Sequence, residues 1–290
     1  MIYRLLAINI DGSLLRSSGR LQKGVKEAID FVSEKGVYVT LFTSRNFQSA
    51  QKVAKALKLG SILVTHSGAF IADSLDKPLV QKALSEEKTF NLVQVLEHFA
   101  CNIRICHERF AIGNRRKAAA SLIAKTVLSS TDPAFYPIQF VESLGDALRD
   151  QPVAAPKIDV YFEDKQEKER ALATLREAFE HINIIECDGE KIEILPADIS
   201  KLRGLQLLGN HLGIEVCEMV AIGDSIDDLE VIENVGLGVA MGNAPIAIKQ
   251  AADWITRSNN ENGVTYMIKE HFRKQFPLHF LKDHIKMKRW

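Results

Sequence analysis

A short apolar run near the start of the chain ends in two polar side chains that are separated by one residue. The run 5–8 is followed by Asn9, Ile10, Asp11 and Gly12. Residues two apart in an extended chain point to the same side, and glycine permits a sharp turn directly after them. We therefore expect Asn9 and Asp11 to face one small site, of a kind that suits metal binding and covalent or acid/base chemistry.

Further polar groups stand where other apolar runs end or where a helix begins. Together with the first pair they are Asn9, Asp11, Thr43, Lys201, Asp224, Asp227 and Asp228. Carboxylates combined with a hydroxyl and an amine suit phosphate chemistry with a divalent cation, because Mg²⁺ prefers hard oxygen ligands. The hydroxyl can bind a phosphoryl oxygen, and the amine can neutralise charge that develops during transfer. Each residue alone is also compatible with an ordinary turn or helix cap.

The elements that would position these groups alternate between strand and helix in the first and last parts of the chain. Predicted strands cover 5–9, 37–42, 62–64, 219–222 and 238–241. Predicted helices cover 21–35, 47–59 and 200–212, and two more begin at 229 and after 242–245. This alternation is typical of a parallel sheet, in which the carboxyl ends of the strands meet along one edge and ligands bind. The fold class is α/β, with a Rossmann-like parallel-sheet core.

The middle of the chain has a different pattern. It predicts helices at 86–99, 115–128 and 165–181, a strand or hairpin at 102–112, a turn-rich stretch at 129–156 and a strand at 157–162. Residues 182–195 are typical of a hairpin around Asp188-Gly189, which is an antiparallel signal. We therefore expect an α+β cap domain at 85–194, inserted into a core formed by 1–84 and 195–290.

Composition narrows the class of protein. The chain has 290 residues, 46% hydrophobic and 26% charged, with 37 basic and 37 acidic side chains. Such a chain has no overall attraction for nucleic acid or membrane, so we expect neither as a partner. The first apolar run contains no signal-peptide pattern and the four cysteines form no CxxC pair, so we expect a cytoplasmic protein. The aromatic and basic segment 271–290 is expected to dock on its own domain or on a second subunit, in a monomer or homodimer.

These motifs, in this order, resemble the haloacid dehalogenase-like hydrolases of the Cof type, which are sugar-phosphate phosphatases with a large inserted cap. The stretches that carry the resemblance are 5–15, 43–45, 199–201, 223–228 and 238–244. It implies that Asn9 occupies the position of the nucleophile, which forms an aspartyl-phosphate in the family, and that Asp11 is the acid/base. Thr43 and Lys201 would bind phosphate.

The resemblance also implies a Mg²⁺ site and a ligand site. The expected metal residues are Asn9, Asp11, Asp224, Asp227 and Asp228. The expected substrate-binding residues are Ser44, Arg45, Ser67 and Asn243.

The chain departs from the family pattern at five places. Asn9 replaces the nucleophilic aspartate, and Ser13, Ser44, Ser67 and Asp227 replace the usual threonine, glycine, asparagine and asparagine. An amide is a much weaker nucleophile than a carboxylate, and Asp227 could restore the negative charge that Asn9 removes.

Two functions follow as alternatives. One is a Mg²⁺-dependent phosphatase acting on small phosphorylated metabolites, sugar phosphates first, either dedicated to one substrate or weak and broad. The other is a catalytically idle protein that binds a phosphorylated ligand or regulates through it.

Overall fold

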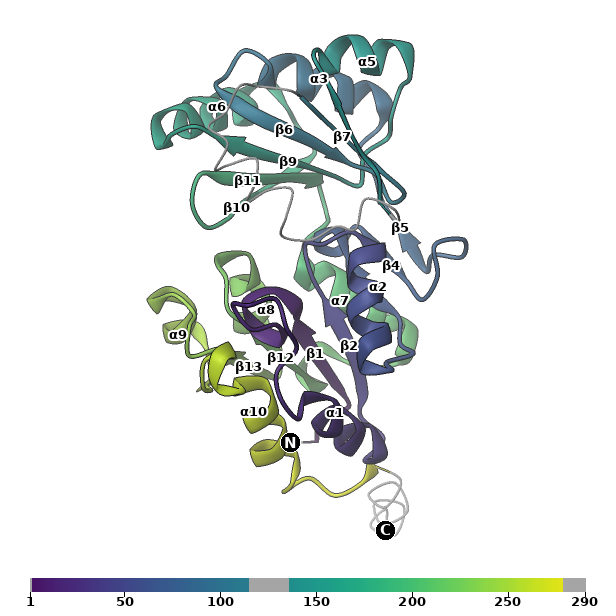
Figure 1. The fold of residues 1–290 in the computed structure, drawn as a ribbon, viewed down its shortest axis with the longest axis vertical. Coiled ribbons are helices and arrows are strands. Elements are labelled where there is room, and N and C mark those ends of the chain that lie inside the picture. Colours follow the sequence, from purple (N-terminus) through teal and green to yellow (C-terminus); the bar gives the residue numbers. More distant parts are fainter. Residues whose placement is uncertain (1, 115–135, 279–290) are drawn as a thin grey trace, which may run out of the picture. The chain divides into compact units, whose positions relative to one another are not determined.

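The computed structural model describes residues 2–114 and 136–278, so the predicted helix at 115–128 and the segment 279–290 lie outside the described residues. The chain divides into two compact units (Figure 1). Unit 1 comprises Met1–Thr43, Val53–Val64 and Leu205–Trp290, and unit 2 comprises Ser44–Lys52 and Thr65–Gly204. The division into a core of 1–84 and 195–290 and a cap of 85–194 stays a prediction.

Unit 1 contains a parallel sheet with the order β14-β13-β12-β1-β2-β3. In this order the strands are Trp254–Ile255, Leu237–Ala240, Met219–Gly223, Leu5–Asn9, Tyr38–Phe42 and Leu63–Thr65. All residues of β1 and β12 are buried, as expected for central strands that are covered on both faces. The predicted α/β fold with a Rossmann-like parallel sheet is confirmed.

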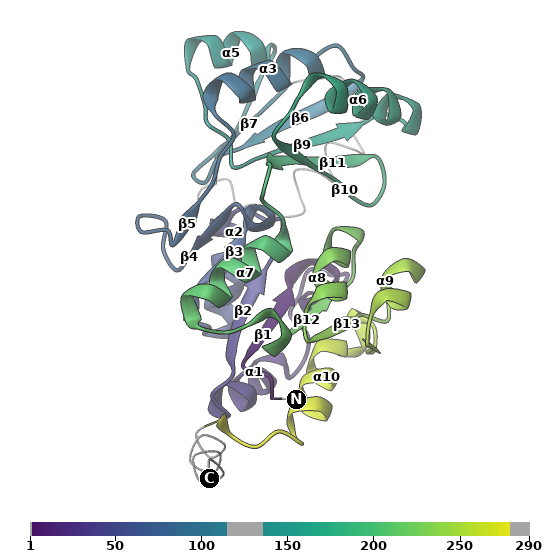
Figure 2. The same ribbon diagram turned by 180° about the vertical axis from the view of Figure 1, so that it is seen from behind.

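Helices cover both faces of this sheet. Helices α1 (Val25–Glu34) and α10 (Gly263–Phe272) pack together on the face toward the viewer in Figure 1. Helix α8 (Leu229–Asn234) lies on the opposite face, toward the viewer in Figure 2, and α9 (Ile246–Ala251) follows β13. Helices α2 (Phe47–Leu57) and α7 (Lys201–Leu212) each have residues in both units.

Helix α1 begins later than the predicted residue 21. Leu15 and Leu21 form an isolated antiparallel bridge, and Gly24 adopts a left-handed conformation directly before the helix. Residues 15–21 are therefore a small turn, which the apolar spacing alone did not separate from the helix. Helix α10 was not predicted.

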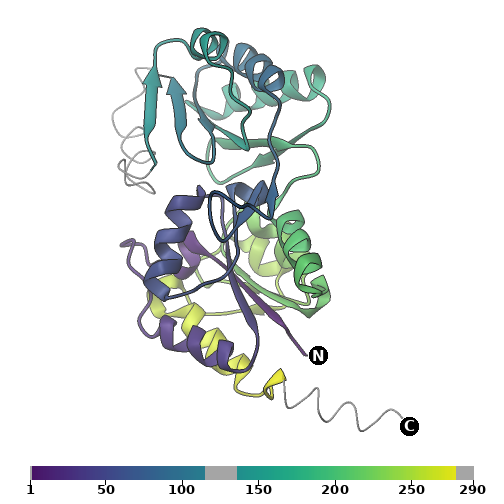
Figure 3. The same ribbon diagram turned by 90° about the vertical axis from the view of Figure 1, so that its right-hand side faces the viewer.

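Unit 2 contains a six-stranded sheet with the order β10-β11-β9-β6-β7-β8, antiparallel except for the pair β7 and β8. The strands are Ile182–Glu186, Lys191–Pro196, Lys157–Phe162, Cys101–Cys106, Ala111–Asn114 and Ile138–Val141. Helices α3 (Glu86–Leu96), α5 (Leu144–Asp150) and α6 (Lys165–Ala178) lie on one side of this sheet (Figure 3). A short hairpin of β4 (Phe70–Ala72) and β5 (Val80–Gln81) completes the unit.

The core of unit 2 lies between the sheet and the three helices. Ile103, Ile158, Val160, Ile192 and Ile194 contribute to it from the sheet. The hairpin predicted at 182–195 is confirmed as β10 and β11. Residues 129–135 of the predicted turn-rich stretch 129–156 lie outside the described residues. The prediction is wrong for 138–150, because β8 and α5 lie there and Ser143 caps α5. Both elements are short, and prolines at both ends of the stretch masked their pattern.

The N-terminus of α3 gives a test of the fold. The Ser85 hydroxyl accepts a hydrogen bond from the backbone N–H of Lys88 at 3.1 Å. Ser85→Ala should lower the free energy of unfolding by about 1 kcal/mol, because it leaves that N–H without its cap. Urea denaturation measures the change. Ser85→Asp, which keeps an acceptor, should be near wild type, and equal stability of Ser85→Ala would contradict the cap.

Candidate active site

Asn9 is the last residue of β1, and both ends of its amide are hydrogen-bonded. Its Nδ2 donates to Asp228 Oδ2 at 2.7 Å, and its Oδ1 accepts from the backbone N–H of Ile10 at 2.7 Å. The side chain is buried, with 4% of the residue exposed. The position that the resemblance assigns to a nucleophile is therefore occupied by a hydrogen-bond donor that points at a carboxylate.

Asp228 organises the loop that follows β12. Besides Asn9, its Oδ2 accepts hydrogen bonds from the backbone N–H groups of Asp224 (3.0 Å) and Ser225 (3.3 Å) and from the Ser225 hydroxyl (3.0 Å). The residue is completely buried. Several donors around one buried carboxylate compensate for the loss of its hydration. Asp227 lies beside it, and its Oδ1 accepts from the same Ser225 hydroxyl at 2.5 Å.

Asp224 is held against the turn after β1. The Ser13 hydroxyl donates to Asp224 Oδ1 at 2.7 Å. Gly12 has φ +67°, and a Cβ placed there would lie 1.8 Å from Asp224 Oδ2. Only glycine satisfies both the left-handed backbone and this close approach. Gly12 is therefore required for the Asp224 carboxylate to lie where it does.

Asn243 also supports this turn. Its Nδ2 donates to the carbonyl of Gly12 at 2.9 Å, and its Oδ1 accepts from the backbone N–H of Asn259 at 2.9 Å. Two amides that the sequence analysis missed act in the same way: Gln22 donates to the Ser13 carbonyl at 2.5 Å, and Asn259 to the Leu15 carbonyl at 2.9 Å. The polar run 258–262 was the signal that could have drawn attention to Asn259.

Strand register places the remaining residues of unit 1. Asn9 pairs with Phe42, so Thr43 is the next residue at the same edge of the sheet. Thr43 is buried, and its backbone N–H donates to the Val64 carbonyl at 2.9 Å. Asp11 lies in the turn after β1, with an extended backbone and an exposed side chain. Within unit 1, Asn9, Asp11 and Thr43 thus lie at the carboxyl ends of neighbouring strands, with the 224–228 loop bonded to Asn9.

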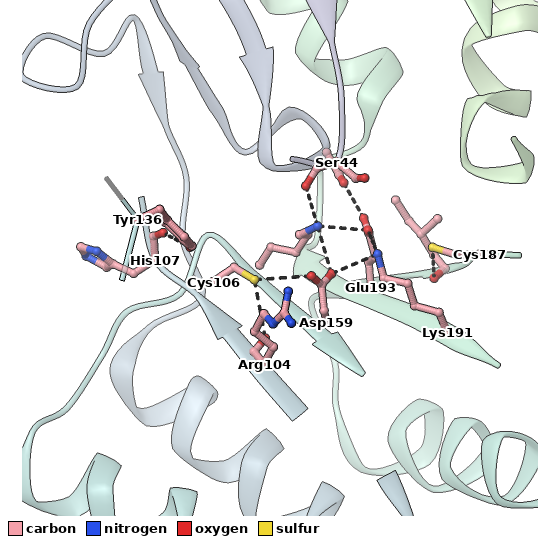
Figure 4. Close-up of polar contacts among 12 residues, drawn as sticks. Ser44, Arg104, Cys106, His107, Tyr136, Asp159, Cys187, Lys191 and Glu193 are labelled. Carbon is pink, nitrogen blue, oxygen red and sulfur yellow. Dashed lines mark hydrogen bonds and ion pairs between the residues drawn. The ribbon is translucent and has the colours of Figure 1, made fainter. Parts of the chain in front are cut away.

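The other predicted site residues lie in unit 2. The Ser44 carbonyl accepts from Lys157 Nζ at 2.8 Å, and the Ser67 hydroxyl donates to Glu193 (Figure 4). The Arg45 guanidinium donates to the Ser49 hydroxyl at 3.2 Å. Lys201 is buried and is the first residue of α7, whose start is capped by the Ser200 hydroxyl.

A buried cluster of charged side chains in unit 2 was missed by the sequence analysis. We call Lys157, Asp159, Lys191 and Glu193 the charge cluster (Figure 4). Burial by itself lowers the pKa of Lys157 and Lys191, but the two carboxylates outweigh it and raise both above their usual range. Burial by itself raises the pKa of Glu193, but the two lysines outweigh it and lower this pKa below its usual range. Charges at alternate positions of predicted strands were the available signal.

The loop after β3 has an unusual backbone. His66, Ser67 and Gly68 all have positive φ, at 50°, 55° and 98°. A Cβ on Gly68 would lie 2.1 Å from the Ser200 carbonyl oxygen, so the loop passes very close to the start of α7. His66 is completely buried, and this burial, with the charge of Lys157, lowers its pKa to about 3.

The pKa of His66 predicts a pH effect on stability. Between about pH 6.5 and pH 3 the unfolded chain binds a proton at this side chain and the folded chain does not, so stability falls as the pH falls through this range. The contribution reaches about 1.4 kcal/mol per pH unit. His66→Asn removes the titrating group and tolerates positive φ. Urea midpoints between pH 6.5 and 4 should therefore fall less steeply for the variant, and parallel curves would contradict the assignment.

Comparison with known proteins agrees with this architecture. The model of the haloacid dehalogenase-like hydrolase family matches residues 6–268. The chain belongs to this family. A solved haloacid dehalogenase-like hydrolase from Bacillus subtilis is 22% identical and superposes with a TM-score of 0.80, covering 92% of this chain and 99% of that chain.

The relatives in sequence include two proteins from Bacillus subtilis that differ in their names. Stress response protein YhaX is 51% identical over 289 residues, covering 100% of both chains. The 5-amino-6-(5-phospho-D-ribitylamino)uracil phosphatase YcsE is 30% identical over 266 residues, covering 92% of this chain and 94% of that protein. The relatives of this chain thus include both a protein named for a stress response and a protein named as a phosphatase.

Two features are absent from the described residues. No helix within 2–114 and 136–278 is long and apolar enough to cross a membrane. In the same part of the chain, no three His, Cys, Asp or Glu side chains are grouped as ligands for a metal.

Proposed function

We propose that this haloacid dehalogenase-like protein binds a small phosphorylated metabolite at a phosphatase-type site, and that Asn9 prevents the covalent step. The hydrogen bond from Asn9 Nδ2 to Asp228 carries this proposal. An aspartate at this position would bring a second carboxylate against Asp228, and the two would have to share a proton or a cation. The amide satisfies Asp228 as a neutral donor and offers no nucleophilic carboxylate.

The ligand class rests on the family and on the residues at the strand ends. Thr43 would bind a phosphoryl oxygen, and Lys201 would neutralise phosphate charge. Ser44, Arg45 and Ser67 would contact the ligand. The phosphatase YcsE acts on a phosphorylated ribitylamino-uracil by its name, which supports a small phosphorylated metabolite here, with sugar phosphates first. Asn243, whose amide is bonded to Gly12 and Asn259, would act by supporting the turn.

Slow hydrolysis by water is the second candidate function, favoured by the position of Asp11. Its exposed carboxylate, in the turn directly after Asn9, could accept a proton from an attacking water. Without a covalent intermediate this route should be much slower than the family reaction. The chain would then be a weak phosphatase instead of an idle binding protein.

The residues in unit 1 fit Mg²⁺. Mg²⁺ needs only one or two protein carboxylates, with water and phosphate oxygens as the other ligands, so the lack of a three-acid group among the described residues does not argue against it. Asp224, pressed against Gly12, and Asp11 would hold the ion, with Asn9 Oδ1 as a neutral oxygen ligand. When bound, the ion would offset the charge of the phosphoryl group. Asp228 would not contact the ion; it would position Asn9 and the Asp224 backbone through its hydrogen bonds to both.

The variant Asn9→Asp tests the proposed function. Restoring a carboxylate should raise turnover of p-nitrophenyl phosphate and a panel of sugar phosphates with Mg²⁺, by up to about a million-fold, the loss that removal of a nucleophile causes elsewhere. Asn9→Asp combined with Asp11→Asn should lose the gain. If the unmodified chain turns over as fast as Asn9→Asp, the proposal that Asn9 blocks the covalent step is wrong. Calorimetric titration with glucose 6-phosphate then distinguishes a chain that binds the ligand without hydrolysing it from a chain that does not bind it.

A second test concerns the metal. If Asp227 restores the charge that Asn9 removes, Asp227→Asn should bind Mg²⁺ about 10–100-fold more weakly in isothermal titration. Asp224→Asn should lose at least as much affinity, because Asp224 is a proposed ligand. Glu230→Gln, an acid in the first turn of α8, is the matched control and should bind as wild type does. Equal affinities for the wild type and Asp227→Asn would contradict the compensation.

A further inference from the structure

The charge cluster occupies one face of the six-stranded sheet of unit 2. Glu193 and Asp159 are direct partners across β11 and β9, and Lys157 and Lys191 stand two residues from them on the same strands. Residues two apart share a face, while Ile158 and Ile192 between them, and Ile194 after Glu193, enter the helix-covered core. The cluster is therefore on the face away from the three helices.

Lys157, Asp159 and Glu193 are almost fully removed from water, and the Lys191 side chain is 20% exposed. The side chains of Lys157 and Glu193 are 2% and 0% exposed, and their Nζ and Oε1 atoms are 3.0 Å apart. Asp159 lies 3.0 Å from Lys157, and Lys191 lies 2.5 Å from Glu193. Two cations and two anions thus compensate one another.

The Lys157–Glu193 pair connects two loops. Lys157 donates to the carbonyl of Ser44 at 2.8 Å, and Glu193 accepts from the hydroxyl of Ser67 through its other oxygen (Figure 4). The two loops also bond to each other, because the backbone N–H of His66 donates to the Arg45 carbonyl at 2.9 Å. The pair is therefore the middle of a continuous chain of polar contacts from residue 44 to residue 67.

These contacts set the orientation of groups that the sheet alone does not orient. In a planar trans peptide the C=O and the next N–H point in opposite directions, so the bond from Lys157 to the Ser44 carbonyl also determines where the N–H of Arg45 points. Ser67 is held in a left-handed conformation that serine adopts rarely, and Glu193 determines the direction of its hydroxyl.

Stability alone does not account for such a pair. Desolvation of two buried charges can exceed their attraction, and replacing a buried ion pair by apolar residues of similar volume is often neutral or stabilising. An apolar pair between β9 and β11 could fill the same space. It could not donate to the Ser44 carbonyl or accept from the Ser67 hydroxyl.

We propose that Lys157 and Glu193 are positioning residues. Lys157 orients the 44–45 peptide so that the Arg45 N–H donates to the phosphate end of the ligand, and Glu193 holds the proton of the Ser67 hydroxyl so that the Ser67 oxygen accepts from a hydroxyl group of the ligand. The part that concerns the ligand rests on the proposed function, in which Ser44, Arg45 and Ser67 contact the ligand. Lys157 and Glu193 themselves do not touch it. Taken as a pair, they contribute to ligand affinity and not to the net free energy of unfolding.

The test compares single and paired replacements. Lys157→Met and Glu193→Met each leave the buried charge cluster with one uncompensated charge and should destabilise the protein. The double variant Lys157→Met/Glu193→Met leaves the total charge unchanged and should recover stability in urea denaturation. Despite this recovery, backbone amide exchange of residues 44–49 and 65–69 should be faster than in wild type. Affinity for inorganic phosphate and glucose 6-phosphate should fall about tenfold or more in calorimetry, the effect of one lost charge-assisted hydrogen bond.

A second ion pair of unit 2 is the matched control. Lys168 and Glu186 lie 3.5 Å apart and contact neither loop, so Lys168→Met/Glu186→Met should leave both exchange and phosphate affinity unchanged. Unchanged exchange in the Lys157→Met/Glu193→Met variant would overturn the positioning role. Faster exchange with unchanged phosphate affinity would overturn its link to the ligand. If the wild type binds neither probe, the proposed function fails, while exchange still decides the positioning role.

Discussion

The hydrogen bond between Asn9 and Asp228 joins the two halves of the phosphatase-type motif in unit 1. It connects the end of β1 to the loop after β12, two adjacent parallel strands. Because Asp228 also accepts from the backbone of Asp224 and Ser225, the same carboxylate sets the position of the whole 224–228 loop. The rest of the site in unit 1 depends on this contact, since Asp224 in turn lies against Gly12 and Ser13.

The chemistry of this bond decides which reactions are accessible. A carboxylate in place of the amide would need a proton or a cation between it and Asp228, and that requirement is one reason why a nucleophilic aspartate goes together with a bound metal. The amide removes the requirement along with the nucleophile. The surrounding framework is retained: the Gly12 turn is supported by Asn243, and the neighbouring turn residues by Gln22 and Asn259. Such retention agrees with a site that still binds a ligand.

In unit 2, polar groups at strand ends are also held in a fixed orientation, but by different side chains. There the polar groups at strand ends are oriented by ion pairs instead of amides, and the partners come from strands more than a hundred residues further along the chain. Charges are suited to this task because their hydrogen bonds are strong and directional, but they must be buried as compensated sets. The four members of the charge cluster meet that condition.

The sequence by itself determined the parallel α/β core, the order of most helices and strands, and the family. Periodic apolar runs and glycine stops are local signals, and the motifs at 9–13 and 223–228 are contiguous. It also identified Asn9 as the departure that matters most. It did not separate the 15–21 turn from α1 or find β8 and α5, because short elements carry too few periodic positions. Only the tertiary structure showed that Asn9 donates to Asp228, that Gln22 and Asn259 support the first turn, and that Lys157 and Glu193 reach Ser44 and Ser67. These contacts join residues far apart in sequence, whose pairing depends on strand register and on the close approach of backbone segments.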